Sequence, residues 1–212
     1  MPELNQVELK ESSLLKQKII GMFEQVQQMF QADFDGFIKN DIDILKQVPA
    51  AELKVTKIYN NLTTKAVEVS KQKISNEAKQ HVGDLVDIIC SVERIGDCCV
   101  DLAERIEYKI VERLLFSEAA VQEYQDLHSK VNQIISDVID AMKASNQELP
   151  KQIVESKTNI NRLVDTYRAN HIERSARGIC DEWAKVRYLD MLDFTKEAAE
   201  HCIEIAEKLM VR

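Results

Sequence analysis

Apolar residues recur three or four positions apart along most of the chain. This spacing runs through residues 13–38, about 49–71 and 77–115, and it is the period of an amphipathic α-helix. The third stretch shows the apolar stripe most clearly, at Leu85, Ile88, Val92, Ile95, Cys99, Leu102 and Ile106. The pattern therefore predicts three long helices, each with one apolar face, as in a helical bundle.

The same pattern starts again in the second half of the chain. Residues 26–37 align with residues 131–142 at a shift of 105, and residues 97–104 align with residues 200–207 at a shift of 103. Chance similarity between amphipathic helices is the alternative, but here two separate helices match in the same order. We therefore interpret the pattern as an internal repeat.

Composition agrees with a helical protein. The chain has 212 residues, of which 45% are hydrophobic and 30% charged, with five Gly and three Pro. Few chain-breaking residues favour long helices over strands and tight turns, and this length can bury a sizeable core. We predict an all-α fold of two tandem three-helix bundles, formed by residues 1–115 and 116–212.

The charge and the cysteines narrow the class of protein. Acidic residues outnumber basic ones 36 to 28, which gives a net charge of −8. The basic residues are scattered, so we expect no nucleic-acid partner. The five cysteines form no C-x-x-C pair, which is typical of reduced cytosolic thiols. No apolar run reaches about 18 residues, so we expect a cytoplasmic chain that does not insert into a membrane, whereas a membrane part outside this sequence stays open.

Three acidic residues stand four apart in the third helix: Glu93, Asp97 and Asp101. Like charges at this spacing repel by a few tenths of a kcal/mol per pair. Two interpretations stay open. The row holds a cation, since carboxylates on one helix face can share a metal ion; or the row is an ordinary charged surface, with ion pairs from Asp101 to Arg105 and from Arg94 to Asp97.

The segment Glu93-Arg94-Ile95-Gly96-Asp97, followed by Asp101-Leu102-Ala103-Glu104, closely resembles the E-R-I-G-D-x-x-x-N-I-A-E signature of the PhoU family. The resemblance implies two tandem three-helix bundles and a role in phosphate homeostasis, as a regulator that contacts a membrane phosphate transporter and its sensor kinase. Some family members bind clusters of iron or zinc through acidic residues spaced E-x-x-x-D. By this resemblance Glu93, Asp97 and Asp101 are the candidate metal ligands.

A second resemblance suggests an alternative function. His171-Ile172-Glu173-Arg174, followed by a Gly and a Cys, is similar to PhoU-type domains at the cytoplasmic end of bacterial sodium/phosphate cotransporters. The chain is then the soluble regulatory domain of such a transporter. A homodimer is compatible with either function.

The second half lacks a matching acidic row. Lys196 stands where Glu93 stands in the first half, which leaves Glu200 and Glu204. An ammonium at this position repels a cation, so we expect any metal in the first bundle alone. Thr56 and Asn161 stand where the family usually has an acidic residue, which weakens both sites.

The remaining candidates favour structure over catalysis. No nucleophile–base set and no Gly-rich phosphate loop is present, so we expect no enzyme. Four further expectations concern seven single residues. Cys99 and Cys202 lie in the core, His171 and His201 face the surface or a partner, Trp183 and Tyr188 pack at the bundle junction, and Gly96 allows a neighbouring helix to come close.

Overall fold

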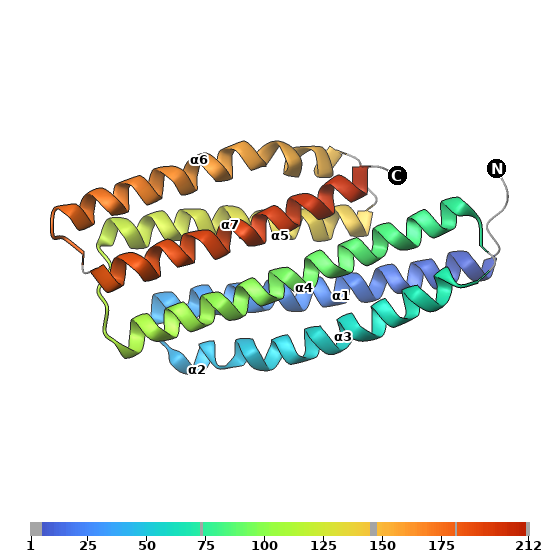
Figure 1. Ribbon diagram of the computed structural model, residues 1–212, viewed down its shortest axis with the longest axis horizontal. Coiled ribbons are helices and arrows are strands. Elements are labelled where there is room, and N and C mark those ends of the chain that lie inside the picture. Colours follow the sequence, from blue (N-terminus) through green and yellow to red (C-terminus); the bar gives the residue numbers. More distant parts are fainter. Residues whose placement is uncertain (1–5, 73, 145–147, 181, 211–212) are drawn as a thin grey trace.

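The computed structural model describes residues 6–72, 74–144, 148–180 and 182–210, and this part of the chain contains helices and no strand (Figure 1). The helices are α1 (Gln6–Lys39), α2 (Ile42–Leu45), α3 (Gln47–Ser70), α4 (Asn76–Val111), α5 (Glu118–Ala144), α6 (Glu148–Ala176) and α7 (Glu182–Met210). The all-α prediction is confirmed.

The six long helices form two bundles. Helices α1, α3 and α4 pack against one another, as do α5, α6 and α7, and the short α2 fills the turn between α1 and α3. The bundles lie side by side, with α4 against α7 and α1 against α5 (Figure 1). The predicted pair of tandem three-helix bundles is therefore confirmed. Its division at 115/116 falls in the connection between α4 and α5 and stays a prediction as a domain boundary.

Local signals in the sequence set several helix ends. The Ser75 hydroxyl accepts a hydrogen bond from the Ala78 backbone N–H at 3.1 Å and caps α4. Asp41 caps α2 through the N–H of Asp43 at 2.9 Å. Gly178 follows α6 with φ at +71°, a left-handed conformation that glycine adopts without strain. The chain can thus turn from α6 into α7.

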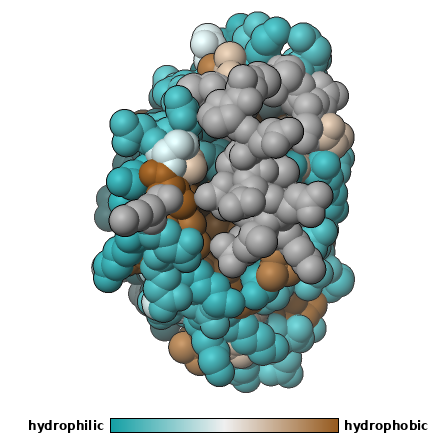
Figure 2. Space-filling model, turned by 90° about the vertical axis from the view of Figure 1, so that its right-hand side faces the viewer, coloured by the Kyte–Doolittle hydropathy of each residue, from teal (hydrophilic) through white to brown (hydrophobic). Residues whose placement is uncertain are grey.

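One apolar core runs through both bundles. The predicted stripe of α4 is buried from Leu85 to Ile106, and Cys99 and Cys202 are fully buried among these side chains, as expected. Burial of apolar surface stabilises the molecule, and the shared core holds the two bundles together. Within the described ranges, no helix is both long and apolar enough to cross a membrane. Figure 2 shows the end where α1 begins and α7 ends, whose described surface is mostly hydrophilic.

The expectations for four of these residues were wrong. His171 and His201 are buried, because the faces that carry them turn toward neighbouring helices. Trp183 is 60% exposed, whereas Tyr188, one turn further along α7, is fully buried as predicted. A Cβ atom added to Gly96 lies 3.6 Å from Val55 Cγ1, which is ordinary van der Waals contact, so no close helix approach requires this glycine.

Candidate functional site

The predicted acidic row lies on the solvent side of α4. Glu93 and Asp101 are partly buried and Asp97 is exposed, while the apolar stripe of the same helix faces the core. The two ion pairs considered as the alternative are not found among the described residues. Arg105 instead bonds Glu104 and Asp190. The carboxylates therefore lack direct basic partners.

The electrostatics of the row show mutual repulsion. Partial burial raises the pKa of Glu93, and the negative charges of Asp97 and Glu52 raise it further. Burial, Glu52 and Asp101 raise the pKa of Asp97, although Arg94 opposes them. Burial also raises the pKa of Asp101, with Arg105 acting in the opposite direction. A bound cation relieves such repulsion, so the donor chemistry fits a metal ion.

Glu52 is the residue that the sequence interpretation missed. It stands on α3 and acts on the pKa of both Glu93 and Asp97, so the two helices bring three carboxylates to one surface. Thr56, one turn further along α3, donates its hydroxyl to the Glu52 carboxylate. Thr56 stands where the PhoU family usually has an acidic residue, and Glu52 lies one helical turn before it. This E-x-x-x-T spacing was the signal in the sequence that could have identified Glu52.

The corresponding carboxylates of the second bundle already have partners. Lys196 pairs with Glu200 at 3.1 Å. Glu204 binds His201 Nδ1 at 2.9 Å and accepts a hydrogen bond from the Ser91 hydroxyl at 3.2 Å. Burial is the largest single effect and raises the pKa of Glu204, but the hydrogen bond and charge of His201, the hydrogen bond from Ser91 and the charge of Arg94 together outweigh it, so the net pKa is lowered. The carboxylates of the second bundle are therefore engaged by neighbouring side chains, whereas, among the described residues, those of the acidic row in the first bundle are not.

The acidic row is not a formed metal centre. Across the described ranges, no three side chains of His, Cys, Asp or Glu converge closely enough to hold a metal ion. Glu52, Glu93, Asp97 and Asp101 share a surface without closing on one point. Metal binding at this row remains a prediction, and it requires the carboxylates to rotate toward one another.

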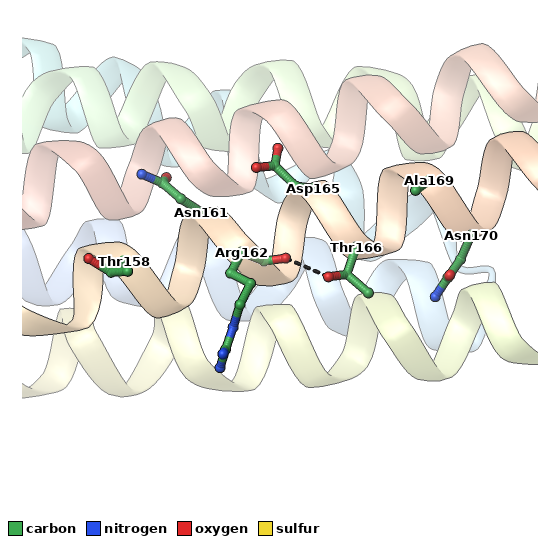
Figure 3. A pocket seen from close by; sticks show the side chains of 7 residues that line it. All are labelled: Thr158, Asn161, Arg162, Asp165, Thr166, Ala169 and Asn170. Carbon is green, nitrogen blue, oxygen red and sulfur yellow. Dashed lines mark hydrogen bonds between the residues drawn. The ribbon is translucent and has the colours of Figure 1, made fainter.

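A surface hollow of about 660 Å³ lies along α6 (Figure 3). Its lining comes from this single helix: Thr158, Asn161, Arg162, Asp165, Thr166, Ala169 and Asn170. The Thr166 hydroxyl donates to the backbone carbonyl of Arg162 at 2.7 Å, within the helix. The hollow is open to solvent, and its side chains point to different sides of α6 (Figure 3), so they do not converge on a small molecule as the groups of a binding pocket do.

A family comparison covers the part of the chain that carries the acidic row. Residues 19–106 match the family model of the PhoU domain. These residues are a PhoU domain. The match extends from α1 through α3 into α4 and includes Glu52, Glu93, Asp97 and Asp101.

Solved structures extend the likeness to the fold of the whole chain. PhoU from Pseudomonas aeruginosa is 16% identical, with a TM-score of 0.87 over 96% of each chain. The phosphate transport system regulatory protein PhoU from Streptococcus pneumoniae is 13% identical, with a TM-score of 0.84 over 95% of this chain and 94% of that one. A PhoU-like protein from Shewanella oneidensis MR-1 is 14% identical, with a TM-score of 0.60 over 96% of each chain. No curated protein sequence matches. The chain therefore has the PhoU fold over both bundles.

Proposed function

We propose that this protein is a regulator of phosphate transport and of phosphate-starvation signalling. The observation that carries the proposal is the PhoU domain at residues 19–106 within a chain that has the PhoU fold over its whole described length. One protein of this fold is described as a phosphate transport system regulatory protein. The proposed role needs protein contacts and no chemical step.

The proposed partners are a membrane phosphate transporter and its sensor kinase, met at the cytoplasmic side of the membrane. Two long, parallel bundles offer extended helix faces for such contacts (Figure 1). A test is affinity capture of the tagged protein from detergent-solubilised membranes of the source organism. Recovery of a phosphate transporter or a sensor kinase supports the proposal, and recovery of neither at two phosphate concentrations contradicts it.

Deletion of the gene tests the function itself. We expect altered phosphate uptake and altered phosphate-starvation signalling, both restored by the wild-type gene. Unchanged uptake together with unchanged signalling in the deletion strain contradicts the proposal. The measurement is the uptake of radiolabelled phosphate by cells grown at high and at low phosphate.

The second proposed function is that of the soluble regulatory domain of a sodium/phosphate cotransporter. The observation that favours it is the resemblance at His171-Ile172-Glu173-Arg174. In the structure His171 packs inside the second bundle, and Arg174 binds Glu123 at 2.5 Å, so these two residues contribute to the core of the domain. Sequencing the gene on both sides of this segment for apolar stretches of about 20 residues distinguishes the two functions.

We further propose that the first bundle binds iron or zinc at Glu93 and Asp97, with Glu52 from the neighbouring helix and Asp101 one turn away. The support is a set of carboxylates with raised pKa values that share one surface. The second bundle is proposed to bind no metal, because Glu200 already forms an ion pair with Lys196. Glu204 likewise interacts with His201 and accepts a hydrogen bond from Ser91. Self-association into a homodimer stays a prediction that gel filtration with light scattering can test.

A further inference from the structure

Asp33 is an acidic side chain in the interior of the protein. It lies on α1, is fully buried, and neither of its carboxylate oxygens has a hydrogen-bond partner. A buried polar group without a partner destabilises the folded state, and a buried charge without a partner destabilises it far more. Burial therefore raises the pKa of Asp33 well above its ordinary value, and no charge from any packed helix counters this effect.

The surroundings of Asp33 come from the helices that join the two bundles. Cys99 of α4 and Tyr124 of α5 are fully buried; burial raises both of their pKa values, and a negative charge on Asp33 raises them further. Thr195 of α7 donates its hydroxyl to Tyr124 Oη at 3.4 Å. The carboxyl group thus lies in a polar cluster to which four helices, α1, α4, α5 and α7, each contribute one side chain.

Among the described residues, no cationic side chain pairs with Asp33. His128 of α5 is stacked between Phe30 and Phe34 of α1, at 4.4 and 4.3 Å between ring centroids. Its Nε2 lies 3.1 Å from the carbonyl oxygen of Phe30, which can only accept, so Nε2–H donates. Burial lowers the pKa of His128 to about 4, which leaves the ring neutral at pH 7. Asp35, two residues after Asp33, faces outward and bonds Gln31 and Lys39.

The internal repeat shows that the fold does not require this cluster. At the repeat shift of 105, Asp33 corresponds to Val138 and Ile19 corresponds to Tyr124; at the shift of 103, Val92 corresponds to Thr195. Val138, Ile19 and Val92 are all fully buried. The other side of the seam is thus built from aliphatic side chains at the equivalent positions. Polar groups on one side alone weaken that side selectively.

We propose that Asp33 is a protonation-controlled latch in the seam between the two bundles. The seam around Asp33 is closed while the carboxyl group is neutral. When the O–H bond of the carboxyl group breaks, the proton passes to water or to a buffer base, and α1 separates locally from α5 so that the carboxylate becomes hydrated. The inference is independent of the proposed role in phosphate transport, because it rests on the interior alone.

The latch has a definite pH response. The ordinary pKa of the group is 3.8, so above about pH 4 the opened segment holds a carboxylate while the closed protein still holds the proton. The closed state therefore binds one proton more than the open state. Its advantage falls as pH rises, and the equilibrium constant for opening grows up to tenfold per pH unit until the folded pKa is reached.

Amide hydrogen exchange of the full chain between pH 6 and pH 9, corrected for the intrinsic exchange rates, measures the opening. Peptides from residues 26–39 and 118–131 should gain exchange with pH beyond the correction, while peptides from α3 and α6 should not. Asp33→Asn should abolish the pH response, because the amide does not titrate. Asp35→Asn, on the outer face of the same helix, serves as the matched control and should retain it.

Asp33→Val keeps the proposal testable if the amide variant fails to fold, because valine occupies the equivalent position 138. This variant should show slower, pH-independent opening of the seam and a higher urea midpoint at pH 9. An unchanged pH response in either Asp33 variant overturns the proposal. So does a wild-type response that is spread evenly over all helices, since it indicates global unfolding and no latch.

Discussion

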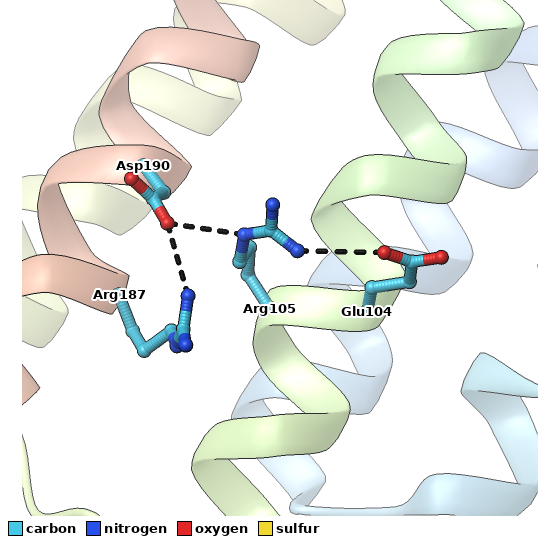
Figure 4. Close-up of polar contacts among 4 residues, drawn as sticks. All are labelled: Glu104, Arg105, Arg187 and Asp190. Carbon is cyan, nitrogen blue, oxygen red and sulfur yellow. Dashed lines mark hydrogen bonds and ion pairs between the residues drawn. The ribbon is translucent and has the colours of Figure 1, made fainter. Parts of the chain in front are cut away.

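Arg105 on α4 donates from Nε to the Asp190 carboxylate on α7 at 3.0 Å, across the seam between the bundles (Figure 4). Arg187 binds the same carboxylate oxygen at 3.3 Å. At the repeat shift of 103, Arg105 corresponds to Lys208, and Asp190 corresponds to Asp87. These two residues also form an ion pair, at 2.5 Å. Two equivalent ion pairs therefore join the antiparallel helices α4 and α7.

The two ion pairs should differ in their contribution to stability. The side chain of Asp190 is 33% exposed and has two arginine partners, whereas that of Asp87 is 55% exposed. Water screens the more exposed pair, which is worth little. We expect Asp190→Asn to lower the free energy of unfolding by about 1 kcal/mol and Asp87→Asn by about 0.3 kcal/mol or less. Urea denaturation of both variants measures the difference, and equal losses contradict it.

Gly96→Ala should stabilise the protein. A Cβ atom at this position makes ordinary contacts with Val55 and Val26, at 3.6 and 3.7 Å, and alanine favours a helix interior by about 0.8–1 kcal/mol relative to glycine. We expect the free energy of unfolding to rise by roughly 0.5–1 kcal/mol.

Gly36→Ala is the matched control for Gly96→Ala, since it is also a glycine within a helix. A Cβ atom there overlaps the buried side chain of Leu45 and lies 3.3 Å from the Asp41 carbonyl oxygen, so a packed side chain has to shift. We expect this variant to be destabilised by about 1–3 kcal/mol. Thermal unfolding of both variants gives the sign directly. A loss of stability in Gly96→Ala shows that the glycine has a role beyond its local contacts.

How far the sequence predicted the structure depends on the helix concerned. The apolar stripe of α4 is long and regular, so its period alone identified the buried residues from Leu85 to Ile106. Helix α6 is polar on most sides, but its buried residues Ile153, Ile160, Val164 and His171 follow one another at spacings of seven, four and seven along one stripe. The burial of His171 was missed because the histidine was interpreted as a surface residue, although it continues this stripe and its ring stacks on Tyr188 of α7.

The candidate site follows the same logic. Glu93, Asp97 and Asp101 lie on one helix and were visible from their spacing. Glu52 reaches the same surface only because α3 packs beside α4. Which residues of two different helices come together depends on how the helices pack, and the spacing of residues along one helix does not determine that packing.

His171 makes the protein sensitive to acid. Its ring stacks on Tyr188 at 4.2 Å between centroids, and neither ring nitrogen has a hydrogen-bond partner. Burial, and then the nearby Arg174, lower its pKa to about 4. Between pH 6.5 and about 4 the unfolded chain therefore binds a proton that the folded protein does not, so stability is lost as pH falls, by up to about 1.4 kcal/mol per pH unit.

His171→Phe preserves the ring stack and removes the titration. We expect it to match or exceed the wild-type free energy of unfolding at pH 7, and its advantage should grow at pH 5. Part of the acid sensitivity should remain, because burial also lowers the pKa of His128 to about 4. Urea titrations at pH 7 and pH 5 measure both effects. An advantage that is the same at the two pH values refutes the assignment.

The acidic row predicts opposite effects of one substitution with and without metal. Glu93→Gln combined with Asp97→Asn removes two of the proposed ligands and should abolish binding of iron or zinc, measured by calorimetry and by elemental analysis. Glu200→Gln is the control and should leave the stoichiometry unchanged, because Lys196 already pairs with Glu200.

In metal-free protein the double variant of Glu93 and Asp97 should be more stable by roughly 0.5 kcal/mol at pH 7, because it relieves repulsion between like charges four residues apart. The raised pKa values of both groups fix the sign of the pH dependence. The folded protein holds these protons more tightly than the unfolded chain, so wild-type stability falls as pH rises above about 4, and the variant loses this fall. If metal raises the unfolding temperature of the variant as much as that of the wild type, the ion binds elsewhere and the assignment to this row is wrong.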